Sequence, residues 1–115
     1  MSNQQWQRVC AETDLFDDAG VCALVDSQGA DSQVAIFKVS HSEQQLYAIG
    51  NFDPIGKANV LYRGIVGSVA NEPVVASPLY KQHFSLTNGK CLQEEEVSVP
   101  VYPVRVNDGF IELLA

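Results

Sequence analysis

Short runs of valine, isoleucine, tyrosine and phenylalanine, each bounded by glycine, proline, asparagine or aspartate, recur along the whole chain. β-branched and aromatic residues favour strands, and the frequent turn residues limit each strand to a few residues. Helix is expected only as one capped turn within residues 11–19. The pattern predicts an all-β antiparallel sandwich or barrel of about ten short strands. The expected strands are residues 5–9, 21–25, 33–39, 45–49, 60–63, 74–77, 83–86, 90–92, 97–106 and 110–114.

Two dipeptides predict tight hairpin turns. Asn88-Gly89 and Asp108-Gly109 each lie between strand-like segments, and both tolerate the positive φ values that a two-residue hairpin loop requires. Residues 51–59 and 64–73 contain no expected strand. Because loops on a rigid scaffold often carry function, these two segments are the first places to look for a site.

The valines near the C-terminus change parity within one expected strand. They occupy odd positions from Val97 to Val101 and even positions at Val104 and Val106, and the change falls at Tyr102-Pro103. A slip of one residue turns side chains to the opposite face of a sheet, so a bulge or sharp bend at this point would keep the valines inside. Proline favours the same interpretation, because it cannot donate to a central ladder.

Charge and length limit the classes of partner. The 115 residues carry 7 Lys+Arg and 14 Asp+Glu, a net charge of −7, which is the wrong sign for binding nucleic acid or an anionic membrane. No apolar run is long enough to span a bilayer and no secretion signal opens the chain, so we expect a cytoplasmic protein. The length suits a single domain over residues 1–115. Charged residues make up only 18%, which favours a subunit that covers part of its surface with a partner over a free-standing domain.

Metal-binding side chains are few and scattered. A tetrahedral zinc or iron–sulfur site needs about four thiolate or imidazole ligands, usually at close spacing. We expect Cys22, which lies in an apolar strand, to be a buried small hydrophobe rather than a ligand. The available residues are Cys10, Cys22, His41, His83 and Cys91.

Two loop motifs carry a family resemblance. The segment Tyr47-Ala48-Ile49-Gly50-Asn51-Phe52-Asp53-Pro54-Ile55 resembles the first cluster-binding loop of Rieske iron–sulfur domains, where Cys-Pro-His follows a strand. The segment Ser77-Pro78-Leu79-Tyr80, followed by the Phe84–Gly89 hairpin, resembles their second loop, Cys-Pro-x-His. With Leu61-Tyr62-Arg63-Gly64, the pattern is similar to the small subunits of bacterial NAD(P)H-dependent assimilatory nitrite reductases. The four cluster-ligand positions are occupied by Asp53, Ile55, Ser77 and Tyr80.

The resemblance implies a fold and a role. The fold would be the Rieske-like antiparallel β-sandwich, and the partner would be a large subunit that carries FAD, sirohaem and an iron–sulfur cluster and reduces nitrite to ammonium. None of the four iron ligands is present, and carboxylate, alkyl, hydroxyl and phenol groups do not replace thiolates and imidazoles at a [2Fe–2S] cluster. The resemblance therefore implies a non-catalytic accessory subunit that holds no metal or cofactor of its own.

The loop ends have two compatible interpretations. Arg63, Tyr80 and Lys81 would form an aromatic and cationic patch that docks on the large subunit, and Asp53 and Ser77 would hydrogen-bond the two loops to each other in place of a metal. Two other functions stay open. One is a stand-alone, cluster-free β interaction module with an unrelated partner. The other is a small hydrolase using Asp53, Ser77 and His83, although Ser77 lacks the Gly-x-Ser-x-Gly context.

Overall fold

The computed structural model describes residues 4–27, 29–40, 42 and 44–115. It is almost entirely β, with two single-turn 3-10 helices, η1 (Glu12–Asp14) and η2 (Leu61–Arg63). The strands are β1 (Trp6–Ala11), β2 (Gly20–Ser27), β3 (Ala30–Lys38), β4 (Leu46–Gly50), β5 (Phe52–Asp53), β6 (Ala58–Asn59), β7 (Ile65–Val69), β8 (Glu72–Ala76), β9 (His83–Ser85), β10 (Val101–Tyr102), β11 (Val104–Asn107) and β12 (Phe110–Leu114). The all-β prediction is confirmed.

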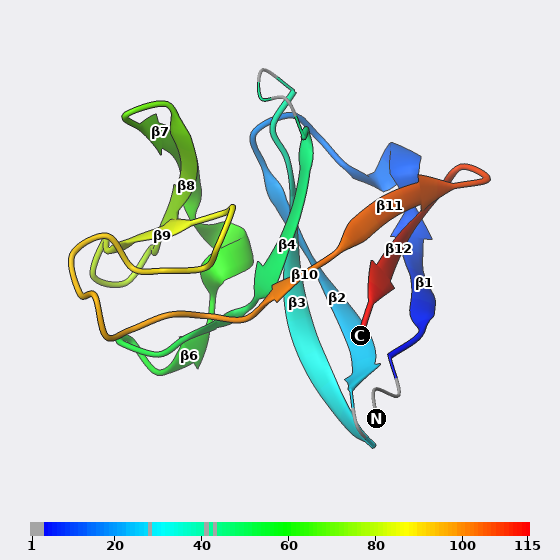
Figure 1. Cartoon of the computed structure of the whole chain (residues 1–115), viewed down its shortest axis with the longest axis horizontal. Helices are drawn as coiled ribbons and strands as arrows, with labels where there is room; N and C mark the ends of the chain where they lie inside the picture. Colours follow the sequence, from blue (N-terminus) through cyan, green and yellow to red (C-terminus); the bar gives the residue numbers. More distant parts are fainter. Residues whose placement is uncertain (1–3, 28, 41, 43) are drawn as a thin grey trace.

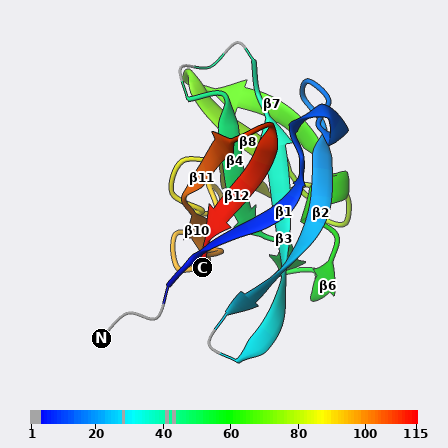
Figure 2. The same ribbon diagram turned by 90° about the vertical axis from the view of Figure 1, so that its right-hand side faces the viewer.

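A central antiparallel sheet, in the order β10-β4-β3-β2, separates two smaller ones (Figure 1). The terminal sheet, β1-β12-β11, lies on one side of it, and the side sheet, β7-β8-β9, lies on the other. Figure 2 shows the N- and C-terminal strands side by side in the terminal sheet. A two-stranded hairpin, β5-β6, extends from the end of β4.

The alternating side chains of β3 supply both cores. Val34 and Ile36 pack with Ile111 and other residues of the terminal sheet, whereas Ala35 and Phe37 face the side sheet and pack in the second cluster. Successive strand residues point to opposite faces, so a strand buried on both faces reads as a continuous apolar run. This explains why residues 34–37 are all buried.

The parity change at Tyr102-Pro103 marks a change of sheet. β10 pairs with β4 in the central sheet, and after Pro103 the chain continues as β11, which pairs with β12 in the terminal sheet. The predicted bend is confirmed, but it does not bury every valine as expected. Val101 and Val106 remain 43% and 42% exposed, because the short strands that carry them are covered on one face only.

One of the two predicted two-residue turns is present. Asp108 and Gly109 have φ values of 56° and 79° in the β11–β12 hairpin. The turn at Asn88-Gly89 is longer than predicted: Ser85 N–H donates to the Lys90 carbonyl, so residues 86–89 form the loop, and only Gly89, at a φ of 79°, has positive φ there. The expected helical turn is η1, where the Asp14 carboxylate accepts the Ala11 N–H at 3.1 Å.

Three strand assignments were wrong in whole or in part. Residues 61–63 form η2 rather than a strand, and residues 90–92 make isolated bridges only. The expected strand 97–106 begins only at Val101, with β10. The expected loop at 64–73 is the β7–β8 hairpin, whose turn uses Ala70 and Asn71 at φ values of 50° and 69°. Nothing in the sequence marked this turn, because alanine rarely adopts positive φ. Residues 51–59 likewise include the short strands β5 and β6.

Cys22 was expected to be buried and is exposed. On β2, Ala23 and Val25 face the core, so the alternation turns Cys22 and Leu24 toward solvent. β2 is an edge strand that is covered on one face only, which an apolar run in the sequence does not reveal. In the part of the chain that the structure describes, no helix is long and apolar enough to cross a membrane.

Candidate functional site

The first loop of the candidate site follows β5 and is organised by Asp53. Its carboxylate Oδ1 accepts the N–H groups of Ile55 at 2.8 Å and Gly56 at 3.0 Å, and its carbonyl accepts the Lys57 N–H at 2.7 Å. Asp53 is fully buried. A short acidic side chain that accepts backbone donors two and three residues ahead stabilises a tight turn, and Lys57 closes this turn with a φ of 59°.

The second loop, after β8, repeats this arrangement with serine in place of aspartate. Ser77 Oγ accepts the Leu79 N–H at 3.3 Å, and the Ser77 carbonyl accepts the Lys81 N–H at 3.0 Å. Lys81, like Lys57, has positive φ, at 64°. The segments Asp-Pro-Ile-Gly-Lys and Ser-Pro-Leu-Tyr-Lys therefore share one backbone design, with a side-chain oxygen first and a left-handed lysine last.

The two loops contact each other directly. Ser77 Oγ donates to Asp53 Oδ2 at 2.5 Å, and both residues are buried. A Cβ placed on Gly56 would lie 2.4 Å from Leu79 Cδ1, so this glycine permits the close approach of the loops. The expectation that Asp53 and Ser77 hydrogen-bond the loops to each other is confirmed.

Asn51 anchors the base of the first loop, a role that sequence reasoning did not assign. It is fully buried, its Nδ2 donates to Gln33 Oε1 at 3.1 Å, and its Oδ1 accepts the Tyr62 N–H at 2.8 Å. Its backbone carbonyl accepts the Leu61 N–H at 3.1 Å. One side chain thus joins β3, the end of β4 and η2. The sequence feature that could have indicated this role is a side-chain amide directly after the apolar strand β4.

The remaining predicted site residues have different surroundings. Ile55 is half-buried against the core cluster of the side sheet, whereas Tyr80 is 65% exposed. Arg63 and Lys81 are also exposed, Arg63 at the end of η2 and Lys81 at the end of the second loop. No hydrogen bond, ion pair or ring contact within the described residues joins Arg63 to Tyr80 or Lys81, so their common role in docking stays a prediction.

The four ligand positions do not fit a [2Fe–2S] cluster. The carboxylate of Asp53 is occupied by two backbone donors and by Ser77, and Ile55 offers only hydrocarbon. Such clusters need thiolates or imidazoles. Among the described residues, no group of three or more His, Cys, Asp or Glu side chains is placed to hold a metal ion.

The hydrolase trio is not assembled. His83 Nδ1 lies 3.2 Å from Gln93 Nε2, and the Ser77 hydroxyl donates to Asp53 instead of to an imidazole. Nucleophilic catalysis by serine requires a base within hydrogen-bond reach of its hydroxyl. The described contacts therefore provide no activated nucleophile at Ser77.

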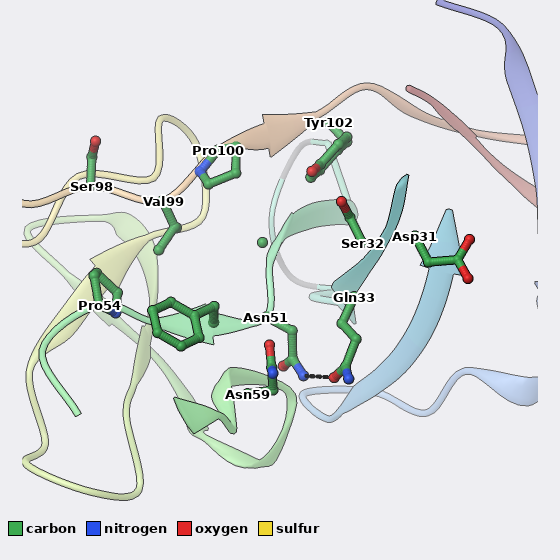
Figure 3. A pocket seen from close by; sticks show the side chains of 12 residues that line it. Asp31, Ser32, Gln33, Asn51, Pro54, Asn59, Ser98, Val99, Pro100 and Tyr102 are labelled. Atoms are coloured by element: carbon green, nitrogen blue, oxygen red, sulfur yellow. Dashed lines mark hydrogen bonds between the residues drawn. The ribbon is translucent and has the colours of Figure 1, made fainter. Parts of the chain in front are cut away.

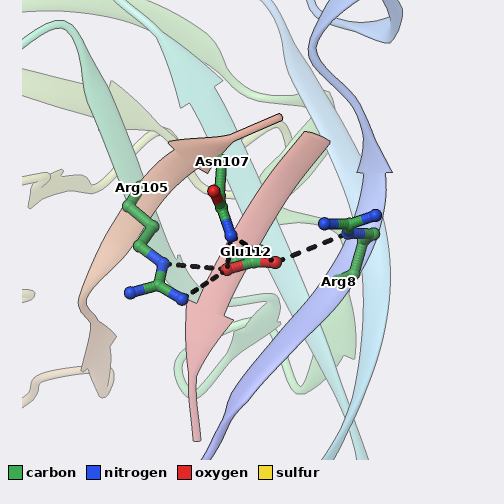
Figure 4. Close-up of polar contacts among 4 residues, drawn as sticks. All are labelled: Arg8, Arg105, Asn107 and Glu112. Carbon is green, nitrogen blue, oxygen red and sulfur yellow. Dashed lines mark hydrogen bonds and ion pairs between the residues drawn. The ribbon is translucent and has the colours of Figure 1, made fainter. Parts of the chain in front are cut away.

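A polar network lies on the outer face of the terminal sheet (Figure 4). The Glu112 carboxylate meets the Arg105 guanidinium at 2.7 Å and Arg8 Nε at 3.4 Å, and Asn107 contributes a further amide donor. The hydrogen bond from Arg105 is the main cause that holds the pKa of Glu112 below its usual value, against the opposing effect of desolvation. Because every member pairs internally, this network explains sheet stability rather than chemistry.

Comparisons with known proteins identify the family of the chain. Residues 5–114 match the family model described as Rieske-like [2Fe–2S] domain. The nitrite reductase (NADH) small subunit of Escherichia coli (strain K12) is 44% identical over 109 residues, which cover 95% of this chain and 96% of that protein. The crystal structure of a putative NADH-dependent nitrite reductase small subunit from Mycobacterium tuberculosis superposes with a TM-score of 0.88 at 41% identity, covering 99% of this chain and 97% of that one.

One relative joins this domain to a much longer chain. The nitrite reductase [NAD(P)H] large subunit of Klebsiella oxytoca is 35% identical over 109 residues, which cover 95% of this chain but only 11% of that one. The motif-based resemblance and the Rieske-like fold are thus confirmed by family, sequence and structure. This chain belongs to the Rieske-like [2Fe–2S] domain family and, within it, to the nitrite reductase small subunits.

Proposed function

We propose that the chain is a non-catalytic accessory subunit that docks on the large subunit of an NAD(P)H-dependent nitrite reductase and holds no [2Fe–2S] cluster of its own. In this proposal FAD, sirohaem and an iron–sulfur cluster reside on the large subunit, which reduces nitrite to ammonium. The observation that carries it is the hydrogen bond from Ser77 to Asp53. It joins the two loops at the positions where Rieske domains place their cysteines.

The loops are complete without a metal. Ser77 Oγ donates to one carboxylate oxygen of Asp53, and two backbone N–H groups donate to the other. Binding iron at these positions would have to break these bonds, and the iron of such clusters takes thiolate or imidazole ligands rather than carboxylate. The chain gains loop rigidity from side-chain hydrogen bonds instead of from a cluster.

Two observations support docking on the large subunit. In the Klebsiella oxytoca relative, the equivalent of this domain is part of the large-subunit polypeptide itself, which places the two units in one molecule there. In this chain, the low share of charged residues, 18%, is typical of a surface that is partly covered by a partner.

The loop end is the proposed contact surface, through Arg63, Tyr80 and Lys81. Tyrosine and arginine are enriched in interface hot spots, and Tyr80 is 65% exposed beside the exposed Leu79. Both other arginines and one lysine form ion pairs elsewhere. Arg8 and Arg105 pair with Glu112, and Lys38 pairs with Asp17. The cations without an ion pair in the described part of the chain are Lys57, Arg63, Lys81 and Lys90.

Alanine substitutions at Tyr80 and Lys81 test the contact surface. We expect the double variant to bind the large subunit at least about tenfold more weakly, since loss of one hot spot costs roughly 2 kcal/mol, with unchanged thermal unfolding. Lys90→Ala, an exposed lysine in the neighbouring hairpin turn, is the matched control and should bind normally. Unchanged affinity of the double variant would reject this surface while leaving the subunit assignment intact.

Affinity purification of the tagged chain from its own cells tests the role. We expect a large partner with flavin and sirohaem absorption and with NADH-dependent nitrite reduction. Purification with an unrelated protein, or without any partner, would favour the stand-alone interaction module.

A further inference from the structure

The first residues of β3 have no neighbouring strand on one edge. β4 pairs with β3 only from Val34 to Lys38, although β3 begins at Ala30. The last rung is the bond from Asn51 N–H to the Gln33 carbonyl at 3.0 Å. After Asn51 the chain leaves for β5, so residues 30–32 extend past the end of β4.

The backbone of Asp31 faces this open edge. In an antiparallel pair, two opposite residues either bond to each other or both point outward. Asp31 lies opposite Asp26, and the backbone of Asp26 points outward, because its N–H and carbonyl bond to the Gln7 side chain at 2.9 and 2.7 Å. The N–H and carbonyl of Asp31 must therefore point away from β2, toward the place that β4 has vacated.

The two outer edges of the β2–β3 hairpin differ in whether their backbone groups have partners. Exposed strand edges bind other strands unless they are blocked, and the amide of Gln7 blocks the β2 edge at Asp26 by imitating a neighbouring backbone. At Asp31, no residue in the described part of the chain supplies a partner for either backbone group. The β3 edge therefore keeps one free donor and one free acceptor in strand geometry.

A pocket of about 400 Å³ lies along the open edge (Figure 3). Pro100 and Tyr102 lie on one side of it, and Gln33 and Asn51 lie on the opposite side, joined by their own hydrogen bond. The half-exposed ring of Phe52 also lines it. The space beside the free backbone groups thus has aromatic and apolar side chains on one side and polar side chains on the other, which suit alternate residues of an extended peptide.

We propose that this open edge of β3 receives an extended segment of the large subunit as an added strand, with a basic residue of that segment near the Asp31 carboxylate. The inference rests on the proposed function for the identity of the partner. Backbone hydrogen bonds supply affinity in this mode of recognition, and side-chain pockets supply specificity. Asp26 and Asp31 are both exposed near the turn of the β2–β3 hairpin. The net charge of the chain is −7, so a basic segment complements this surface.

Hydrogen exchange of the whole chain, with and without the large subunit, tests the strand addition. We expect slower exchange in the peptide covering residues 29–34 when the large subunit is present. Asp31→Pro removes the free N–H without breaking the β2 ladder and should weaken binding at least about tenfold. Asp26→Pro removes the same charge together with an N–H that Gln7 already occupies, so it should weaken binding less than Asp31→Pro does. Asp31→Asn keeps the N–H, so it should bind with a smaller loss that shrinks at high salt.

The outcomes separate the two proposals. If the large subunit binds while exchange at residues 29–34 is unchanged, or if Asp31→Pro binds as tightly as the unaltered chain, the strand addition is wrong and the accessory role stands. If the large subunit does not bind at all, the proposed function fails and this inference fails with it. Slower exchange that depends on the concentration of the chain alone would show a second copy at the edge and would contradict the proposal. The exchange experiment uses the unaltered chain, so it decides the matter even if a proline variant does not fold.

Discussion

Replacing Ser77 with alanine removes the bond that joins the two loops. The variant loses the 2.5 Å hydrogen bond to Asp53 Oδ2 and the 3.3 Å bond from the Leu79 N–H. Hydrogen bonds to charged groups contribute about 1.5–3 kcal/mol, and a buried carboxylate that loses a donor keeps its desolvation cost. We expect the free energy of unfolding to fall by about 2 kcal/mol, which corresponds to roughly 10 °C in Tm for a domain of this size.

Urea unfolding followed by circular dichroism measures this loss. Ser68→Ala is the matched control, because Ser68 is an exposed serine on β7, and surface changes of this kind stay within about 0.5 kcal/mol. A double-mutant cycle with Asp53→Asn isolates the coupling between the two side chains. If Ser77→Ala unfolds within about 0.5 kcal/mol of the unaltered chain, the direct bond does not hold the loops together and the reasoning fails.

Three further predictions concern the rest of the molecule. Phe37→Ala, which empties the centre of the core beneath the side sheet, should cost about 3–5 kcal/mol in urea unfolding; a loss under about 1 kcal/mol would contradict the packing described. Arg105 lowers the pKa of Glu112 in the folded chain. The Glu112 carboxylate therefore stabilises the fold at pH values above the ordinary pKa of glutamate, and this stabilisation is lost as the pH falls through the lowered pKa. Glu112→Gln should therefore be less stable at neutral pH and lose less stability on acidification, and parallel pH profiles would refute this. In the native chain, a thiol reagent should modify the exposed Cys22 before the buried Cys91, and more slowly than a free thiol because burial raises the pKa of Cys22.

The sequence predicted what local chemistry controls. The Asp108-Gly109 turn and the bend at Pro103 both follow from backbone restrictions of single residues, and both are present. The β7–β8 hairpin was missed because its turn residues, Ala70 and Asn71, carry no glycine signal. Its strands contain residues such as Gly67 and Ser68 that are weak strand formers.

The candidate site was predictable in part. The contact between Asp53 and Ser77 followed from the family resemblance together with the rule that buried polar groups find partners. The roles of Asn51 and of the open edge at Asp31 depend on where β4 ends relative to β3. Strand ends are the least predictable feature of a sequence, because tertiary packing decides them. The docking role of Arg63, Tyr80 and Lys81 stays a prediction.

Complementation of an isolated large subunit by the iron-free chain tests the central claim most directly. The chain would be unfolded, stripped of metal, refolded without iron or sulfide, and titrated into the large subunit while NADH-dependent nitrite reduction is followed. The account predicts saturable binding and full activity with no iron on this chain. Activity that appears only after iron and sulfide are loaded onto this chain would contradict it.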